Sequence, residues 1–416
     1  MAAPTLENWE MTAALKDLTD WLTRKGLENA PVETWLEECC VRLVDAGIPL
    51  QRVNITTRAH HPEIGTVAFR WHRDRENERE DFRRRASVSE EFVQSPIYYL
   101  LSNPVDEIRQ NLSDPEPELN FPLFDDLRER GATDYFAVKR FFLLPNDATP
   151  VQPLQAEEGV IISLTTDAQG GFTNAQLDGI RQFLPPLCLT LKCGANRLMA
   201  EDITAAYMGR DASRRVLSGD ITRGSSQTLS AVIWYFDLQG FTKLSETLPG
   251  DSIIELLNDC FAEAVDVVER NGGNVLKFMG DGMLAIFDMD QIPEARRVAI
   301  QAALELREAF VTLNERRTSQ ELATTGFTLA LHAGDVLYGN IGGKTRLDFT
   351  VIGPAVNTTS RILGMCNAVD QTVVISASVA AELLSKIPEL VSLGQYRLRG
   401  VTERLELFTL DYGGRN

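Results

Sequence analysis

The C-terminal half of the chain alternates between strand-like and helix-like runs, and their order restricts the fold more than any other feature. A strand-like run at 231–236 precedes a helix pattern with an apolar face at Ile254, Leu257, Phe261, Val265 and Val268. Asn271–Gly273 (NGG) ends this helix, because glycine readily adopts the backbone conformation of a helix end. Two strand-like runs, 274–279 and 283–287, then flank Gly280–Gly282 (GDG) and predict a hairpin.

A second helix and one more strand complete the pattern. The helix is marked by apolar residues four apart, and the strand by apolar residues two apart: Val298, Ala302, Leu306 and Phe310, then Phe327, Leu329 and Leu331. The resulting order, β-α-β-β-α-β, is that of the split βαβ or ferredoxin-like arrangement. We therefore predict an α+β fold for residues 229–416, in which the antiparallel centre brings Asp237 and Asp281 side by side.

Each of these two aspartates follows a strand-like run. Asp237 comes after Ala231–Phe236, and Asp281 comes shortly after Asn274–Leu276. Two carboxylates held at one point repel each other unless cations lie between them, and two-metal phosphoryl chemistry uses this arrangement. The pair therefore predicts a divalent-metal site that binds a phosphate-containing substrate.

Three motifs resemble the signatures of class III nucleotidyl cyclases. They are Phe236–Thr242 (FDLQGFT), Lys277–Asp281 (KFMGD) and Asp348–Arg361 (DFTVIGPAVNTTSR). Their order and spacing also agree with that family, and the resemblance covers roughly residues 229–410. Each motif alone is a weaker signal than the three together.

The resemblance implies a role for the residues around the aspartate pair. Asp237 and Asp281 would hold two Mg²⁺ or Mn²⁺ ions, with help from the backbone carbonyl of Leu238. The residues Gly240, Phe241 and Thr242 would open a helix whose free backbone N–H groups suit phosphate oxygens.

The third motif implies residues for the nucleoside part of the substrate. Asn357 and Arg361 are four apart on an expected helix, so their side chains share a face. In the family, such an asparagine orients the ribose, and such an arginine meets the charge that develops on the α-phosphate. Late in the chain, Arg399 is a candidate cation for the triphosphate.

Lys277 and Thr350 match the two base-selecting positions of the family. An ammonium can donate to N1 of adenine, and a hydroxyl can accept from its 6-amino group. By the same resemblance, guanylate cyclases have Glu and Cys at these two positions. The pair Lys277 and Thr350 therefore points to ATP. The expected reaction is therefore the conversion of ATP to 3′,5′-cyclic AMP and pyrophosphate by an adenylate cyclase. A cyclase for another base, including a pyrimidine, and a degenerate cyclase-like dimerisation module remain the alternatives.

The family also implies a homodimer with shared sites. The aspartate pair of one protomer would face the nucleoside-binding residues of the other, namely Lys277, Thr350, Asn357 and Arg361. One chain carries both halves, so a two-fold dimer would hold two equivalent sites.

The front half of the chain resembles a GAF-type sensory domain. The resemblance is carried by Gly131–Ala137 (GATDYFA) and Gly170–Thr173 (GGFT), and it covers roughly residues 30–195. Two helices are expected at the N-terminal end, over about residues 6–48. We expect a GAF-like regulatory domain at 1–195, a helical linker and transducer element at 196–228 and the cyclase domain at 229–416. The effector of the front domain is unknown.

The connecting helix carries a possible heptad repeat. Leu184, Leu191, Leu198 and Ala205 are seven residues apart, which predicts the seam of a short coiled coil; a single amphipathic helix packed on its own domain is the alternative. A long helix is expected from near Thr173, and Pro185 and Pro186 predict that the regular part of the coiled coil begins near Leu187.

Composition restricts the partners. The 416 residues carry a net charge of −18, which argues against nucleic-acid partners. The N-terminus has no signal-peptide pattern, and no apolar run approaches the roughly 18 residues that a membrane helix requires. The six cysteines include no C-x-x-C motif. We therefore expect a cytoplasmic protein without a transmembrane segment.

Overall fold

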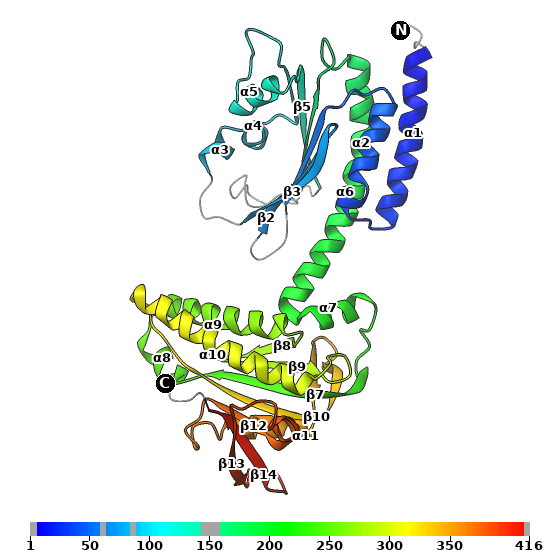
Figure 1. Ribbon diagram of the computed structural model, residues 1–416. Helices are drawn as coiled ribbons and strands as arrows, with labels where there is room; N and C mark the ends of the chain where they lie inside the picture. The colour runs from blue at the N-terminus through cyan, green and yellow to red at the C-terminus, as the bar shows by residue number, and fades with distance from the viewer. Residues whose placement is uncertain (1–5, 59–63, 84–88, 143–158, 412–416) are drawn as a thin grey trace. The chain divides into compact units, whose positions relative to one another are not determined.

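The computed structural model of the chain describes residues 6–58, 64–83, 89–142 and 159–411. The chain divides into two compact units, Met1–Ile203 and Thr204–Asn416. Each unit has its own sheet and its own hydrophobic core (Figure 1).

The front unit is built on a six-stranded antiparallel sheet with the strand order β3-β2-β1-β6-β5-β4. Its strands are β1 (Arg52–Arg58), β2 (Ile64–His72), β3 (Arg75–Arg83), β4 (Glu107–Asn111), β5 (Asp134–Phe141) and β6 (Gly159–Thr166). Its helices are α1 (Leu6–Leu27), α2 (Leu36–Asp45), α3 (Glu90–Val93), α4 (Pro96–Ser102), α5 (Pro122–Glu129) and α6 (Asn174–Met208), with a 3₁₀ turn at Val32–Thr34. Helices α1, α2 and α6 cover one face of the sheet, and α4 and α5 pack on the other (Figure 1).

Strand β3 is absent from the sequence-based prediction. Its nine residues, Arg75–Arg83 (RENEREDFR), are all exposed, so they show no apolar alternation. It is an edge strand of the sheet. Charged side chains on an edge strand discourage pairing with other chains, and the same charges remove the pattern that would identify the strand from sequence.

Helix α6 confirms the long helix expected from near Thr173, because it begins at Asn174. It continues through Pro185 and Pro186, so the prediction that its regular part begins only near Leu187 is wrong. A proline inside a helix removes an N–H donor. Here the neighbouring Leu184 and Leu187 are buried in the core of the front unit, and this packing holds the helix together.

The predicted coiled-coil seam is also wrong in its first half. Leu184 and Leu191 are only 2% and 3% exposed, because both pack into the core of the front unit. Neither can therefore form a seam with a second chain. Leu198, by contrast, is 36% exposed and lies outside that core. The alternative, an amphipathic helix packed on its own domain, describes this part of α6.

The burial of Leu191 leads to a stability prediction. Leu191→Glu should lower the free energy of unfolding of the front unit by about 3 kcal/mol or more, because it buries an unpaired carboxylate. Leu189→Glu is the matched control, since Leu189 is 59% exposed two residues away on the same helix. Urea denaturation of the two full-length variants tests this, and equal midpoints would contradict the assigned burial.

The back unit contains an eight-stranded, mostly antiparallel sheet with the order β13-β14-β12-β10-β7-β9-β8, and β11 pairs with β10. Its strands are β7 (Ser226–Leu238), β8 (Asn274–Met279), β9 (Gly282–Asp288), β10 (Phe327–Gly342), β11 (Leu347–Ile352), β12 (Val373–Ser376), β13 (Leu390–Tyr396) and β14 (Leu405–Leu410). Its helices are α7 (Arg210–Leu217), α8 (Phe241–Thr247), α9 (Gly250–Arg270), α10 (Ala295–Ser319), α11 (Pro354–Leu363) and α12 (Ala377–Ala380), with a 3₁₀ turn at Ala381–Leu383. The predicted hairpin around Gly280–Gly282 is confirmed.

Strand β7 is buried on both faces, and alternation assigns its residues to two different cores. Trp234 and Phe236 belong to the larger core under α9 and α10 (Figure 1). Ile233 belongs to a second core on the opposite face, and Tyr235 packs against that core. Because side chains alternate along a strand, Asp237 lies on the face of Ile233 and Tyr235, away from α9 and α10.

The predicted apolar face of α9 packs against the core except at Ile254: Val268 is buried, and Leu257, Phe261 and Val265 are partly buried. The buried residues of the helix are Leu256, Cys260, Ala264, Val267 and Val268, whereas Ile254 is 59% exposed. A helix that carries apolar residues on more than half of its circumference has two possible faces by spacing alone, and contact with α10 decides between them.

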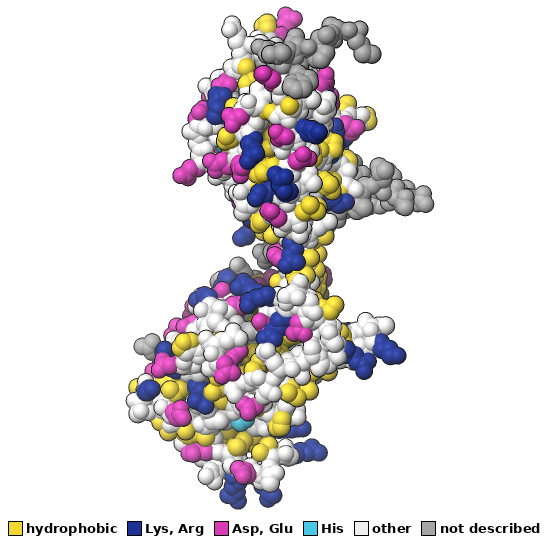
Figure 2. Space-filling view, turned by 90° about the vertical axis from the view of Figure 1, so that its right-hand side faces the viewer, with side chains coloured by type: hydrophobic (Ala, Val, Ile, Leu, Met, Phe, Trp, Pro, Cys, Tyr) yellow, Lys and Arg dark blue, Asp and Glu magenta, His cyan; other side chains and the backbone are white. Residues whose placement is uncertain are grey.

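In the part of the chain that the structure describes, no helix combines the length and apolar character needed to cross a membrane. Figure 2 shows basic and acidic side chains interspersed over the visible face of the molecule rather than gathered in a patch of one sign.

Candidate active site

The two predicted metal-binding aspartates lie at the ends of adjacent strands. Asp237 is the penultimate residue of β7, and its register partner on β9 is Gly282. Asp281 directly precedes Gly282, in the turn of the β8–β9 hairpin. The N–H of Leu238 donates to the Asp281 carbonyl at 3.3 Å (N···O). Strand pairing thus brings both aspartates to one end of the sheet.

Two glycines of the hairpin make this approach possible. A Cβ atom on Gly282 would lie 3.0 Å from Oδ1 of Asp237 and 3.1 Å from the carbonyl oxygen of Phe236, so a side chain there would displace the carboxylate. Gly280 has a φ of +67°, a conformation that favours glycine. The GDG sequence therefore supplies both the turn and the space for the aspartate pair.

The electrostatics of the pair fit a cation site. Burial raises the pKa of Asp237 to about 6, and the Asp281 charge contributes to this rise. A cation between the carboxylates would remove the repulsion and favour ionisation. Among the described residues, no group of three or more His, Cys, Asp or Glu side chains could hold a metal. Two carboxylates and a backbone carbonyl fit Mg²⁺ or Mn²⁺, which keep several water or substrate-phosphate ligands.

The predicted phosphate-binding residues follow the first aspartate. Gly240 has a φ of +65° and precedes α8, and Phe241 and Thr242 form the first turn of that helix. The Gly240 carbonyl accepts from the N–H groups of Lys243 and Leu244 at 3.1 and 3.2 Å. The structure thus places these residues directly after β7, and their contact with phosphate stays a prediction.

Lys277, on β8, has a partner that the sequence analysis missed. Its Nζ donates to Oδ2 of Asp348 on β11 at 3.0 Å. Asp348 and Thr350 are two residues apart on the same strand, so their side chains share a face. Strand alternation within the third motif was the available signal, because it places Asp348 beside the predicted base-selecting threonine.

Thr350 is the other predicted base-selecting residue. It is 5% exposed, and its Oγ1 is buried without a hydrogen-bond partner among the described residues. A buried hydroxyl that lacks a partner is uncommon in proteins, and a substrate group can supply the missing hydrogen bond.

Lys277 lies on the same sheet face as the carboxylate pair. Its register partner is Leu284 on β9, and Leu284 in turn pairs with Tyr235 on β7. Directly opposite residues share a face, and Tyr235 and Asp237 are two apart on one strand. The face opposite α9 and α10 therefore carries both the predicted metal ligands and the predicted base-selecting lysine.

Asn357 and Arg361 both lie on α11 and are exposed. The buried residues of this helix, Ala355, Thr359 and Ile362, hold its other side against the unit. The two predicted nucleoside-binding side chains therefore share an outward-facing surface, as their spacing predicts.

The structure does not bring Arg399 to the aspartate pair. It is exposed in the turn between β13 and β14, and β12 and β10 separate β14 from β7 in the sheet. Its contact with the triphosphate stays a prediction without support from the strand order.

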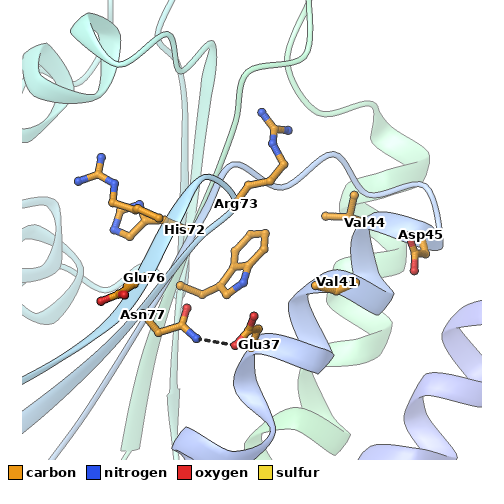
Figure 3. Close-up of a pocket in the computed structure, with 10 residues that line it drawn as sticks. Glu37, Val41, Val44, Asp45, His72, Arg73, Glu76 and Asn77 are labelled. Carbon is orange, nitrogen blue, oxygen red and sulfur yellow. Dashed lines mark hydrogen bonds between the residues drawn. The ribbon is translucent and has the colours of Figure 1, made fainter.

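A cavity of about 470 Å³ lies elsewhere, in the front unit (Figure 3). It is lined by α2 and by the β2–β3 hairpin, and Figure 3 shows Val41 and Val44 of α2 beside it. Asn77 of the hairpin donates to Glu37 Oε2 across it at 3.4 Å. None of the predicted site residues lines this cavity, so it is not part of the candidate active site.

Comparison with known proteins assigns the back unit to a family. The sequence of residues 225–411 matches the family described as the adenylate and guanylate cyclase catalytic domain. An adenylate cyclase of Anabaena cylindrica is 29% identical over 197 residues, which cover 45% of this chain and 38% of the relative. Adenylate cyclase 1 of Rhizobium meliloti is 24% identical over 223 residues, or 53% of this chain and 33% of the relative. The chain thus spans between 33% and 38% of the length of these two relatives.

Among solved structures, the adenylyl cyclase CyaB from P. aeruginosa aligns with a TM-score of 0.42 and 23% identity, over 46% of this chain and 98% of that one. The three motifs and the family match fall on the same segment, and residues 225–411 are a class III nucleotidyl cyclase catalytic domain.

Proposed function

We propose that the protein is an adenylate cyclase that converts ATP to 3′,5′-cyclic AMP and pyrophosphate. The observation that carries this proposal is the convergence of the Asp237–Asp281 pair and Lys277 on one face of the sheet.

We further infer a ferredoxin-like arrangement for residues 229–416, since β7, β8, β9 and β10 follow the order β10-β7-β9-β8 in the sheet.

The carboxylates of Asp237 and Asp281 and the carbonyl of Leu238 would hold two Mg²⁺ or Mn²⁺ ions. When bound, such ions lower the pKa of the ribose 3′-hydroxyl and neutralise the triphosphate. The 3′-hydroxyl gives its proton to water, the 3′-oxygen forms a bond to the α-phosphorus, and the bond from that phosphorus to the bridging oxygen breaks. Pyrophosphate leaves with the electron pair. Arg361 would meet the charge on the α-phosphate, and Asn357 would orient the ribose.

Recognition of adenine would fall to Lys277 and Thr350. The ammonium donates to N1, and the Thr350 hydroxyl accepts from the 6-amino group and so gains its missing partner. Asp348 holds Nζ of Lys277 at 3.0 Å, which fixes the ammonium beside β11.

Base preference should change when this donor and acceptor pattern is inverted. Lys277→Glu with Thr350→Cys should lower kcat/KM for ATP by roughly 10²-fold and raise it for GTP. Lys344→Glu, a charge reversal at an exposed residue between β10 and β11, is the control. Competition between ATP and GTP, followed by product chromatography, measures the effect. An unchanged preference in the double variant means that these two residues do not read the base.

We infer a homodimer with two shared sites. The supporting observation is a pair of exposed apolar side chains beside Thr350: Leu337 (43%) on β10 and its register partner Ile352 (45%), which lies two residues from Thr350 on β11. Large apolar side chains exposed together are typical of interaction surfaces. The outward-facing Asn357 and Arg361 would then reach the aspartate pair of the partner.

We also propose that the front unit is a GAF-like domain that regulates the cyclase. Its six-stranded antiparallel sheet with helices on both faces supports this assignment. Its effector is not identified.

Turnover of ATP by the purified full-length protein tests the main proposal. Cyclic AMP and pyrophosphate should form in equal amounts with Mg²⁺ or Mn²⁺ and should not form with EDTA. Parallel reactions with GTP, CTP and UTP distinguish an adenylate cyclase from a cyclase for another base. Absence of product with all four nucleotides favours a degenerate cyclase-like module.

A further inference from the structure

The short helix α7 packs against the strands that carry the predicted base-recognition residues. It follows Gly209, whose φ is +83°. A Cβ atom on Gly209 would lie 2.6 Å from the carbonyl oxygen of Val275 on β8. This contact is two residues from Lys277, so the start of α7 lies directly against the lysine-bearing strand.

One arginine of α7 contacts two aromatic rings on the neighbouring strands. The Arg215 guanidinium carbon is 5.1 Å from the ring centroid of Tyr338 on β10 and 6.0 Å from that of Phe349 on β11. The two rings pack edge to face, with centroids 4.7 Å apart. Phe349 is the residue between Asp348 and Thr350, so Arg215 rests on the strand that would read the base.

Arg215 is itself held in place. Its Nε donates to Oδ2 of Asp211, one turn earlier on α7, at 2.9 Å. Asn274, the first residue of β8, donates to the Tyr338 hydroxyl at 3.3 Å. Helix α7, β8 and β10 are therefore joined through one cluster of polar and aromatic side chains.

The segment after α7 contacts β10, the strand that bears Tyr338. The side-chain amide of Asn340 on β10 donates to the backbone carbonyl of Asp220 at 2.8 Å. The backbone carbonyl of Asn340 accepts from the N–H of Gly224 at 3.0 Å. Asn340 is the register partner of Phe349. The whole segment 209–225 thus contacts β8, β10 and β11, the strands that hold Lys277 and Thr350.

We propose that segment 209–225 sets the position of the base-recognition strands and that Arg215 is a positioning residue for Lys277, Asp348 and Thr350. This inference rests on the proposed function. A shift of α7 moves Phe349 and Val275, and with them the groups that bind the base. Binding of the nucleotide then changes without any change at the aspartate pair. The helix α6 leads into this segment, and Thr204 near its end lies 2.5 Å (O···O) from Ser213 of α7.

The test compares Arg215→Gln with wild type in steady-state kinetics of the full-length protein. We expect KM for ATP to rise about ten-fold, the preference for ATP over GTP to fall, and kcat to change less. Arg215→Lys keeps the charge but loses the planar group, so it should show a smaller rise in KM. Arg210→Gln is the matched control on the same helix, because Arg210 pairs with Glu269 of α9 instead.

A merely structural role gives a different result. In that case Arg215→Gln lowers the melting temperature and the active fraction, while KM and base preference stay at wild-type values, and the proposal is overturned. If Arg215→Gln does not fold, Tyr338→Phe provides the second test: it removes the hydroxyl that Asn274 contacts, keeps the ring, and should also raise KM. Absence of ATP turnover in the wild type is a failure of the proposed function, separate from either result.

Discussion

Replacement of either predicted metal ligand, as Asp237→Asn or Asp281→Asn, should lower kcat of the cyclase reaction by roughly 10³-fold or more. Metal ions supply several kcal/mol of charge stabilisation in the transition state, and about 4 kcal/mol corresponds to a factor of this size. Asparagine has nearly the same shape as aspartate, so the backbone of the β8–β9 hairpin and the contact of Gly282 with residue 237 should be kept. The loss should therefore come from metal binding rather than from repacking.

The melting temperature distinguishes a loss of metal binding from repacking. The like charges of the pair disfavour the metal-free fold, because Asp281 helps to raise the pKa of Asp237. Removal of one charge should thus leave the melting temperature in EDTA unchanged or raise it. Mn²⁺ should raise the melting temperature of the wild type, and this added stabilisation should be lost in both variants.

Asp290→Asn is the control for the removal of a carboxylate, because Asp290 is exposed in the turn after β9. It should keep wild-type turnover and the Mn²⁺ response. Near-wild-type kcat in Asp237→Asn or Asp281→Asn would falsify the two-metal assignment.

Much of the back unit follows from local sequence pattern. The GDG hairpin and the strand before Asp237 are predictable because each is marked by neighbouring residues, and antiparallel pairing then brings Asp237 opposite Gly282. The pairing of the two aspartates needs only the strand order and no knowledge of remote side chains. For this reason the three motifs are sufficient to place the candidate site.

The features that sequence does not predict depend on contacts between distant residues. Lys277 and Asp348 are joined by an ion pair across 71 positions, and Arg215 stacks on rings from two other strands. Alternation places Asp348 on the face of Thr350, but no periodicity marks its pairing with Lys277 or the contacts of Arg215. Leu191 has the heptad spacing of a coiled coil, but it is buried in the core of its own unit. Spacing identifies an apolar face, and only the fold decides what covers that face.

Mixed dimers should recover activity when two inactive variants carry their defects in opposite halves of the site. Asp281→Asn lacks a metal ligand, and Asn357→Ala lacks the predicted ribose contact, so each homodimer has two damaged sites. If each site takes its aspartates from one protomer and Asn357 from the other, a heterodimer holds one site with both defects and one intact site. Random exchange makes half of the dimers heterodimers, so equal mixing should give about one quarter of wild-type turnover.

The matched control mixes Asp281→Asn with Asp237→Asn. Both changes lie in the metal-binding half, so every site in a heterodimer still lacks one carboxylate, and turnover should stay at the level of the single variants. This control removes the explanation that mixing merely stabilises the protein. Exchange of subunits is first demonstrated with differently tagged chains. If exchange occurs and the Asp281→Asn plus Asn357→Ala mixture remains inactive, each site is built within one chain. The exposed apolar side chains of Leu337 and Ile352 then need another partner.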